Sequence, residues 1–537
     1  MMFRIMDHVR TSLRNAWPGL LVIAIAAAAQ LFLITRPLDF LLTHILPDDA
    51  FYYFEIARNI ALGLGSTFDG FSMTNGYHPL WMLILVPIFS IFGGDVGALE
   101  PIRAALALTV VLNVATAFLV WLILGRFTKS VFVRTLGLAV WALNPFLLYQ
   151  GINGLETSLS LFLLSLLFWQ ALRIEEEAKD RAINTIPLRR FVVLGIIGGL
   201  CILARLDTAI YVGAILLWVV LRDLSWQSLS RAVTTGLVVC ACVFLWLVWN
   251  ITNFGMLSTS SAGANMLVNY TIIFQDNGTS VYQAIKGEFY MLHGHITALM
   301  QHTGAPGLAY VLFGSALALV CIGAWAIPRR WRDIPVVYAF ALGFGLLFFL
   351  NVAVRWTGGK WYFVSFGILI SILAVVVLEH LRARWQFAER TKQLTALALT
   401  GLIAFLFFTW WHKELTDPAL QQREMYAAAL WLDENLPDAR VGVFNAGIIG
   451  YFSSAGVINL DGLVNNDAYA AMKERRLYGY LRDANITHVA DFPVYLTYRY
   501  KSFWGVPDIM ENLEELQTIF LGAHNRSGDG LHIYTVR

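Results

Sequence analysis

Apolar runs of roughly 18 to 22 residues recur along most of the first 411 residues of the chain. About 20 apolar residues is the length that an α-helix needs to cross the hydrocarbon core of a bilayer. The composition agrees: 58% of the 537 residues are hydrophobic and only 14% are charged, whereas a soluble domain carries about 25% charged residues. The mean hydropathy is +0.62. We therefore predict a polytopic α-helical membrane protein.

Net charge and cysteine usage argue against several classes of function. The formal net charge is +2, which gives no electrostatic reason to expect a nucleic-acid partner. All four cysteines lie inside apolar runs, so they predict small core residues and neither a disulfide framework nor a metal site. The basic N-terminus precedes a long apolar run that has no clear cleavage site, and we expect an uncleaved first span.

The distribution of basic residues predicts the orientation of the spans. The N-terminus is expected in the cytoplasm, with a first span at about 18–34 that could continue to Ile45. The run 80–92 is short, and if it lies on the outer surface every later basic loop falls inside. This predicts about eleven transmembrane helices in a bacterial inner (plasma) membrane, with the C-terminus outside. The remaining spans are expected at about 104–125, 135–152, 157–173, 191–204, 208–221, 232–250, 308–327, 334–354, 361–380 and 394–411.

The chain changes character near residue 412. We predict a transmembrane domain over 1–411, with a first outer loop at 46–103 and a long outer loop at 252–307, and a periplasmic α/β domain over 412–537. Short apolar runs, frequent charges and alternating strand and helix patterns indicate this second domain. Helices are expected around 428–432, 447–454 and 467–484, and strands at 440–444, 457–460, 488–490 and 531–536.

Two adjacent carboxylates, Asp48 and Asp49, follow the first span and are expected at the outer membrane surface. Ionisable groups at membrane depth usually serve function, and a carboxylate acting as general base contributes about 10²–10⁴ to a rate. Because neighbouring side chains point in different directions, we expect one of the two to reach the substrate, with Asp49 favoured. The other would cap the helix that begins near Phe51. Glu156 is the second carboxylate for which we predict a catalytic role.

A departing lipid phosphate needs cations around it. The predicted phosphate-binding residues are Arg205, Arg355, Lys360 and His78, although His78 could also be structural. The predicted substrate-lining residues are Tyr52, Tyr53, Asn75, Tyr77, Trp81, Asp207 and Trp356, whose aromatic members could equally form an interfacial belt. No cofactor is predicted; a divalent cation stays open, because the spacing of His293 and His295 is only weakly indicative of metal.

Several of these segments together resemble the GT-C superfamily of membrane glycosyltransferases. The resemblance is closest to the mycobacterial-type terminal arabinofuranosyltransferases and more distant to the lipid A aminoarabinose transferases and protein O-mannosyltransferases. It implies a catalytic acid in the first outer loop, juxtamembrane helices after it, and a second acid in the next outer loop, where Glu156 stands. The segments that carry it are Asp48-Asp49, Ala57-Arg58-Asn59, the run from Thr74 to Trp81, Gly154-Leu155-Glu156-Thr157 and, in the tail, Asp461-Gly462-Leu463-Val464-Asn465.

The sequence therefore predicts a glycosyltransferase that works at the outer face of the membrane. Its partners would be membrane lipids, a polyprenyl-phosphate sugar as donor, and a hydroxyl of a cell-envelope glycan, lipid or protein as acceptor. The alternative is a transporter or flippase for a lipid-linked or small anionic substrate, although no duplicated halves are visible in the sequence. A glycan-binding relative without turnover and an O-antigen ligase or polymerase also stay open. The donor sugar and the acceptor are not predicted.

Overall fold

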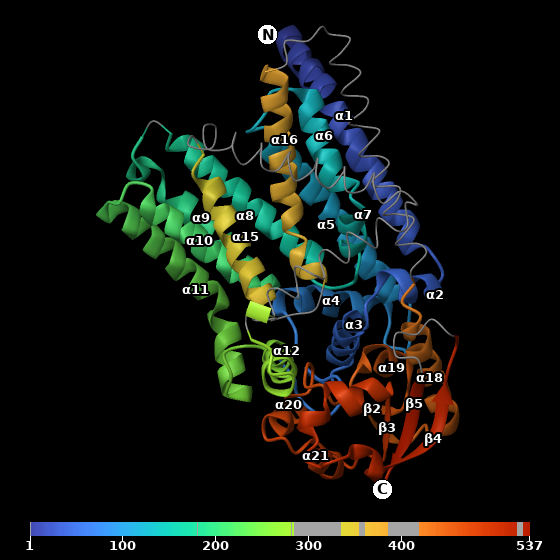
Figure 1. The fold of residues 1–537 in the computed structure, drawn as a ribbon. Coiled ribbons are helices and arrows are strands. Elements are labelled where there is room, and N and C mark those ends of the chain that lie inside the picture. Colours follow the sequence, from blue (N-terminus) through green and yellow to red (C-terminus); the bar gives the residue numbers. More distant parts are fainter. Residues whose placement is uncertain are drawn as a thin grey trace.

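A computed structural model describes residues 2–179, 181–280, 282–283, 334–353, 360–384, 418–522 and 530–537. These residues form a bundle of long helices, a C-terminal α/β domain, and a layer of short helices between the two (Figure 1). The N-terminus lies at the end of the bundle that is remote from the C-terminal domain (Figure 1).

The bundle contains the helices expected of a membrane domain. Its members are α1 (Met2–Ile34), α5 (Glu100–Leu124), α6 (Val131–Ala142), α7 (Pro145–Gln150), α8 (Thr157–Glu177), α9 (Leu188–Ala204), α10 (Ala209–Leu221), α11 (Trp226–Phe254), α15 (Val336–Ala353) and α16 (Phe366–Arg384). Four described stretches are long and apolar enough to cross a membrane: Ala16–Ile34, Glu100–Leu124, Thr157–Glu177 and Trp226–Phe254. The predicted spans 308–327 and 394–411 lie outside the described residues, so the number eleven stays a prediction.

Three of the predicted spans differ from the observed helices. Helix α1 ends at Ile34, and the chain continues after a turn as α2 (Leu38–Phe40) and the π-helix η1 (Leu41–Ile45), so the first span does not run on to Ile45. The predicted span 135–152 is broken, because Asn144 caps a new helix, α7, whose first residue is a proline. The predicted span 361–380 begins only at Phe366, after the 3-10 turn η5 (Lys360–Phe363).

The layer between bundle and domain consists of short helices. They are α3 (Asp48–Ala61), α4 (Pro79–Phe92), η3 (Leu206–Thr208), α12 (Ser260–Tyr270) and the π-helix η4 (Thr271–Asp276), whereas the 3-10 turn η2 (Ile183–Thr185) belongs to the loop between α8 and α9. Helix α4 is the run 80–92 of the sequence analysis; it packs on α3, α5 and α9. Trp81 and Leu85 of α4 are fully buried, whereas Leu83 and Ile91 are exposed. This one-sided burial is that of a helix lying against the bundle.

The C-terminal domain is built on a five-stranded sheet of order β2-β1-β3-β5-β4. Strand β1 pairs in parallel with β2 and β3, and β5 pairs antiparallel with β3 and β4. Its elements are α18 (Gln421–Asn435), β1 (Arg440–Val443), α19 (Ala446–Phe452), β2 (Gly456–Asn459), α20 (Asn466–Lys473), α21 (Leu477–Asp483), β3 (His488–Asp491), η6 (Tyr495–Arg499), η7 (Lys501–Phe503), η8 (Ile509–Asn512), β4 (Leu513–Ile519) and β5 (Leu531–Val536).

Most elements of this domain lie where the sequence predicts them, with two differences. Strand β4 was not predicted, because its buried residues, Leu513 and Ile519, stand only at its ends and the residues between them are exposed or half-buried. The predicted helix 467–484 is two helices, α20 and α21. The chain turns between them at Arg475, whose φ of 52° lies in the left-handed region.

Alternate residues of the strands serve two separate cores. Val489 and Tyr534 belong to a cluster with α20, α21 and Trp504. Their neighbours Ala490 and Ile533 face the other way and join a larger core that continues through α18 and α19 into α3 and the helix bundle. The C-terminal domain therefore shares a hydrophobic core with the helix bundle, and this shared core fixes the position of the domain against α3.

Candidate active site

A solvent-accessible pocket lies where the bundle, the layer of short helices and the C-terminal domain meet. Residues from seven separate segments of the sequence converge on it. It is lined by Asp49, Tyr52, Tyr53, Gly76, His78, Leu155, Glu156, Arg205, Leu206, Asp207, Thr259, Ser261, Ala262, Asn265, Trp361, Tyr362 and Leu463. Seven of these residues were predicted from the sequence as site residues, and the fold brings them together: Asp49, Tyr52, Tyr53, His78, Glu156, Arg205 and Asp207.

The two adjacent aspartates point to different places. Both stand in the first turn of α3, where consecutive residues are rotated by about 100° around the axis. Asp49 lines the pocket. The carboxylate of Asp48 instead accepts hydrogen bonds from the backbone N–H groups of Gly447 (3.2 Å) and Ile448 (2.7 Å). Asp48 therefore caps α19 of the C-terminal domain, and the prediction that it caps its own helix is wrong, because Pro47 is the N-cap of α3 and Asp48 lies inside it.

Burial changes the acidity of both carboxyls. Desolvation, and after it the negative charge of Glu156, raise the pKa of Asp49 to about 6, and Arg499 of the C-terminal domain opposes the shift. Burial also raises the pKa of Asp48 to about 7, against the two backbone hydrogen bonds that it accepts. A carboxylate with a pKa near 6 is still ionised at neutral pH and is a stronger base than an exposed aspartate.

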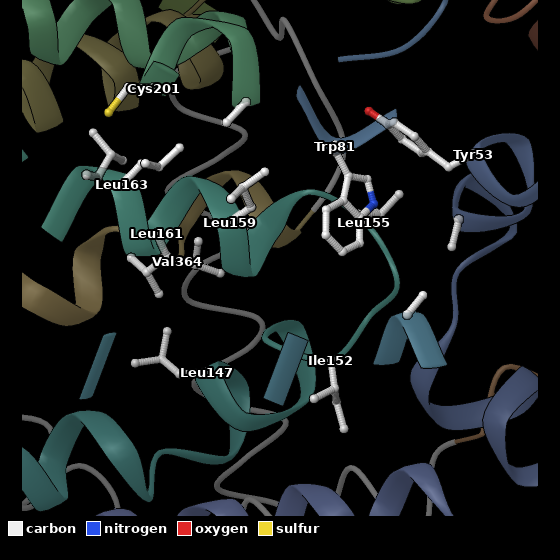
Figure 2. Close-up of a cluster of buried hydrophobic side chains, with 14 of the residues drawn as sticks. Tyr53, Trp81, Leu147, Ile152, Leu155, Leu159, Leu161, Leu163, Cys201 and Val364 are labelled. Atoms are coloured by element: carbon white, nitrogen blue, oxygen red, sulfur yellow. The ribbon is translucent and has the colours of Figure 1, made fainter. Parts of the chain in front are cut away.

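Glu156 stands on the residue before α8, at the end of a tight turn. Gly154 in this turn has a φ of 80°, and a Cβ there would lie 2.9 Å from Leu46 and Phe54 side-chain atoms. The turn is held from α4, because the indole N–H of Trp81 donates to the carbonyl of Gly154 at 3.1 Å. Figure 2 shows Trp81 beside Leu155 at this point, with Tyr53 near the pair. The buried carboxylate of Glu156 lies 3.6 Å from Arg205 Nη1 and 3.8 Å from His78 Nε2.

Arg205 ends α9 and turns its guanidinium into the pocket. Its Nε donates to Asp207 at 3.1 Å, its Nη1 lies near Glu156, and its Cζ lies over the ring of Tyr362, 4.0 Å from the ring centre. Burial alone would lower the pKa of Arg205, but the carboxylates of Asp207 and Glu156 hold it above its usual value. The guanidinium is therefore charged.

Two buried nitrogen atoms in the pocket have no hydrogen-bond partner in the described part of the chain. They are Nη2 of Arg205 and Nδ1 of His78. Burial lowers the pKa of His78, so its imidazole is neutral at pH 7 and Nδ1 can donate or accept. Buried polar groups are normally paired, and an arginine N–H in a pocket is a ready donor for an anionic oxygen such as that of a phosphate.

Three predicted site residues lie in or next to residues 354–359, which the structure does not describe. Arg355 and Trp356 lie outside the described residues. The backbone of Lys360 begins η5, and nothing further is described for its side chain. Their predicted roles stay predictions.

Three predicted substrate-lining residues do not line the pocket. Asn75 is fully buried and joins four partners: its amide donates to Asn250 and Ser258, and its carbonyl accepts from Ser260 and Asn466. The hydroxyl of Tyr77 hydrogen-bonds Ser66 at 2.7 Å, and the indole N–H of Trp81 donates to the carbonyl of Gly154. The polar groups of all three hold loops in place, and the predicted contact of these residues with substrate stays a prediction.

Ten lining residues were not predicted as site residues. Five of them lie within two positions of a predicted residue: Gly76, Leu155, Leu206, Trp361 and Tyr362. The other five come from segments in which no site residue was predicted. Thr259, Ser261, Ala262 and Asn265 belong to the start of α12 and the residue before it, and Leu463 comes from the C-terminal domain. The run Ser258-Thr259-Ser260-Ser261 is typical of a helix start and could have marked α12. Leu463 lies in a segment that carries the resemblance, but nothing in the sequence places it at the pocket, because its position depends on the docking of the C-terminal domain.

Metal binding has no support from side-chain geometry in the described ranges. They contain no group of three or more His, Cys, Asp or Glu side chains placed to hold a metal ion. His293 and His295 lie outside these ranges. A divalent cation stays a prediction.

The fold is similar to two kinds of solved membrane protein. The apo oligosaccharyltransferase of Archaeoglobus fulgidus has a TM-score of 0.60 and 14% identity, over 93% of this chain and 73% of that one. The same protein, AglB, with an inhibitory peptide and a dolichol-phosphate gives 0.58 and 15%, over 94% and 73%. ArnT of Cupriavidus metallidurans bound to undecaprenyl phosphate gives 0.55 and 14%, over 96% and 97%.

These similarities place the chain in the GT-C type of fold with a C-terminal α/β sheet domain. A closer relation to arabinofuranosyltransferases stays a prediction. A family model described as a domain of unknown function, DUF8728, matches residues 413–534. A comparison of the sequence with curated proteins gives no match.

Proposed function

We propose that the protein is a membrane glycosyltransferase that moves a sugar from a polyprenyl phosphate to a hydroxyl group. The observation that carries the proposal is the shared pocket of Asp49, Glu156 and Arg205, with Arg205 Nη2 unpartnered among the described residues. A transferase of this kind needs one base for the acceptor and one cation for the leaving phosphate. The pocket holds both, at the end of the bundle that meets the C-terminal domain.

In the proposed reaction Asp49 removes the proton of the acceptor hydroxyl. The acceptor oxygen forms a bond to the anomeric carbon of the sugar as the bond from that carbon to the phosphate oxygen breaks. The phosphate leaves with the bonding electron pair and stays on the polyprenyl chain. The charged guanidinium of Arg205 stabilises the negative charge on the leaving oxygen, and Glu156 and Asp207 hold that guanidinium in place.

The proposal places this pocket at the extracytoplasmic face of a bacterial inner membrane. The opposite end of α8 is charged and forms ion pairs with arginines in or beside the ends of the neighbouring helices: Arg126 with Glu176, Arg190 with Glu177 and Arg222 with Glu175. Arginines on that side match the positive-inside rule. Under this orientation the lipid phosphate reaches Arg205 from the outer leaflet and the C-terminal domain lies in the periplasm.

The test uses purified protein in liposomes and a panel of polyprenyl-phosphate sugars, with donor consumption as the readout. The panel contains arabinofuranose, aminoarabinose and hexose donors, and candidate glycan, lipid and peptide acceptors. Asp49→Asn should lower the transfer rate by about 10²–10⁴, whereas Asp48→Asn, outside the pocket, should keep measurable turnover. Full activity of Asp49→Asn, or no consumption of any donor by the unaltered protein, would contradict the proposal.

A further inference from the structure

Helix α12 supplies an uncharged wall to the pocket. Thr259, Ser261, Ala262 and Asn265 line it, and none of them is ionisable. Within the described lining, every charged or titratable group comes from other segments: α3, the loop before α4, the residue before α8, the end of α9 with the turn after it, and η5. The pocket thus has a charged part, suited to proton transfer and phosphate binding, and a neutral part on α12.

The neutral part retains unused hydrogen-bonding groups. The hydroxyl of Thr259 caps the N-terminus of α12, where it accepts hydrogen bonds from the N–H of Ala262 and from the hydroxyl of Ser261. Asn265 stands one helical turn after Ser261, on the same face of α12. Its half-buried amide makes no side-chain hydrogen bond within the described part of the chain. It therefore presents two N–H donors and one carbonyl acceptor to the cavity.

The position of α12 is fixed by the elements around it. The N–H of Ser260 donates to Asn75, and its hydroxyl donates to the carbonyl of Leu463 in the C-terminal domain at 2.9 Å. On another side, Gly263 packs so closely on Tyr469 that a Cβ would lie 2.6 Å from the tyrosine oxygen. A wall held from two sides presents its polar groups at fixed positions, which is what selective recognition needs.

We infer that α12 selects the sugar, with Asn265 as the specificity-determining side chain and Ser261 assisting it, for the hydroxyls of an uncharged sugar. This inference rests on the proposed function and names the substrate class. Sugar hydroxyls satisfy an amide and a hydroxyl group well. An ammonium or carboxylate group held against this wall would lose water without gaining an opposite charge, which is costly. A site that hydrogen-bonds its substrate discriminates strongly against groups that leave its own polar atoms unpaired.

The experiment compares donors that carry a neutral sugar with donors that carry an amino sugar on the same polyprenyl phosphate. The unaltered protein should prefer the neutral donor by a factor of about 10 or more. Asn265→Ala should raise KM for the neutral donor about 10-fold, with a smaller rise for Ser261→Ala. Asn265→Asp should move the preference toward the amino sugar, because it places a carboxylate on the wall. Met266→Ala, an exposed neighbour on α12, is the matched control and should match the unaltered protein.

The outcomes separate the two proposals. If Asn265→Ala and Asn265→Asp turn over with an unchanged KM and unchanged donor preference while Asp49→Asn is inactive, the inference is overturned and the proposed function stands. A preference of the unaltered protein for the amino sugar also overturns the inference. If the unaltered protein consumes no donor at all, the proposed function fails and the inference falls with it.

Discussion

The carboxylate of Asp48 accepts a hydrogen bond from the backbone N–H of Ile448 at 2.7 Å, across 400 residues of chain. This contact attaches the first turn of α3 to the first turn of α19 in the C-terminal domain. The neighbouring residue, Asp49, stands in the pocket. One dipeptide therefore performs two tasks: it ties the domain down and supplies the proposed base, so the position of the domain and the position of the base depend on each other.

We expect Asp48→Ala to loosen the C-terminal domain. It would leave the N–H groups of Gly447 and Ile448 unpaired in a buried place, which costs about 1–3 kcal/mol. The free energy of unfolding and the rate of proteolysis at the start of the domain measure this. Asp69→Ala is the control, since Asp69 also accepts from two backbone N–H groups but only inside its own loop. Equal effects of the two substitutions would contradict a docking role for Asp48.

The pH dependence of transfer should report the ionisation of Asp49. The base acts in its ionised form, and its pKa is about 6, so kcat/KM should fall as the pH drops below about 6. Glu156→Gln removes a negative neighbour that raises this pKa and should shift the acidic limb to lower pH. Arg499→Gln removes a positive neighbour that lowers it and should shift the limb to higher pH. pH–rate profiles of the three proteins check the directions, and unmoved limbs in both variants would count against Asp49 as the base.

Arg205→Ala should impair both catalysis and stability. Loss of the guanidinium removes the cation proposed to meet the leaving phosphate, at a cost of about 10²–10³ in kcat. It also leaves Glu156 and Asp207 buried without their partner, a type of change that costs about 3–5 kcal/mol. Arg222→Ala, which breaks the pair with Glu175 near the other end of α8, is the matched control.

Two readouts separate the roles of Arg205. Thermal unfolding follows the structural loss, and steady-state kinetics of the folded fraction follow the catalytic one. Arg205→Lys keeps the charge without the planar fork and should recover stability more than activity. If Arg205→Ala remains folded and transfers sugar at the original rate, Arg205 does not bind the leaving phosphate.

Gly76→Ala should displace the C-terminal domain from the pocket rim. An added Cβ would lie 1.9 Å from the carbonyl oxygen of Leu463, a pocket-lining residue, so the backbone of one side must move. Overpacking of this kind costs about 1–3 kcal/mol, and donor KM should rise as Leu463 shifts. Gly479→Ala in α21, where a Cβ meets nothing within 4 Å, should leave stability and kinetics unchanged. Normal kinetics in Gly76→Ala would show that the domain does not shape the pocket.

The sequence predicted those parts of the fold that depend on local pattern. Long apolar runs gave the helices of the bundle, and most strands and helices of the tail lie where alternation and turn residues placed them. Whether an apolar run forms one continuous helix was harder to predict, because hydropathy does not detect a helix cap inside the run. Asn144 and Pro145 start a new helix within a run that hydropathy predicts as one span. Strand β4 was missed for a related reason, since it buries side chains only at its two ends.

The residue types of the site followed from the sequence, because charge next to a bilayer is costly and needs a reason. Asp49, Glu156, Arg205 and His78 were named from that argument, and they share the pocket. Only the tertiary structure decided which residue of each pair or cluster faces it. Rotation by one helix position sends Asp48 to α19 and Asp49 to the pocket, and long-range hydrogen bonds engage the polar groups of Asn75 and Trp81. The neutral wall of α12 and the place of Leu463 in the pocket lining likewise depend on segments that come together only when the C-terminal domain docks. No local sequence pattern predicts these long-range contacts, because the segments are far apart in the chain.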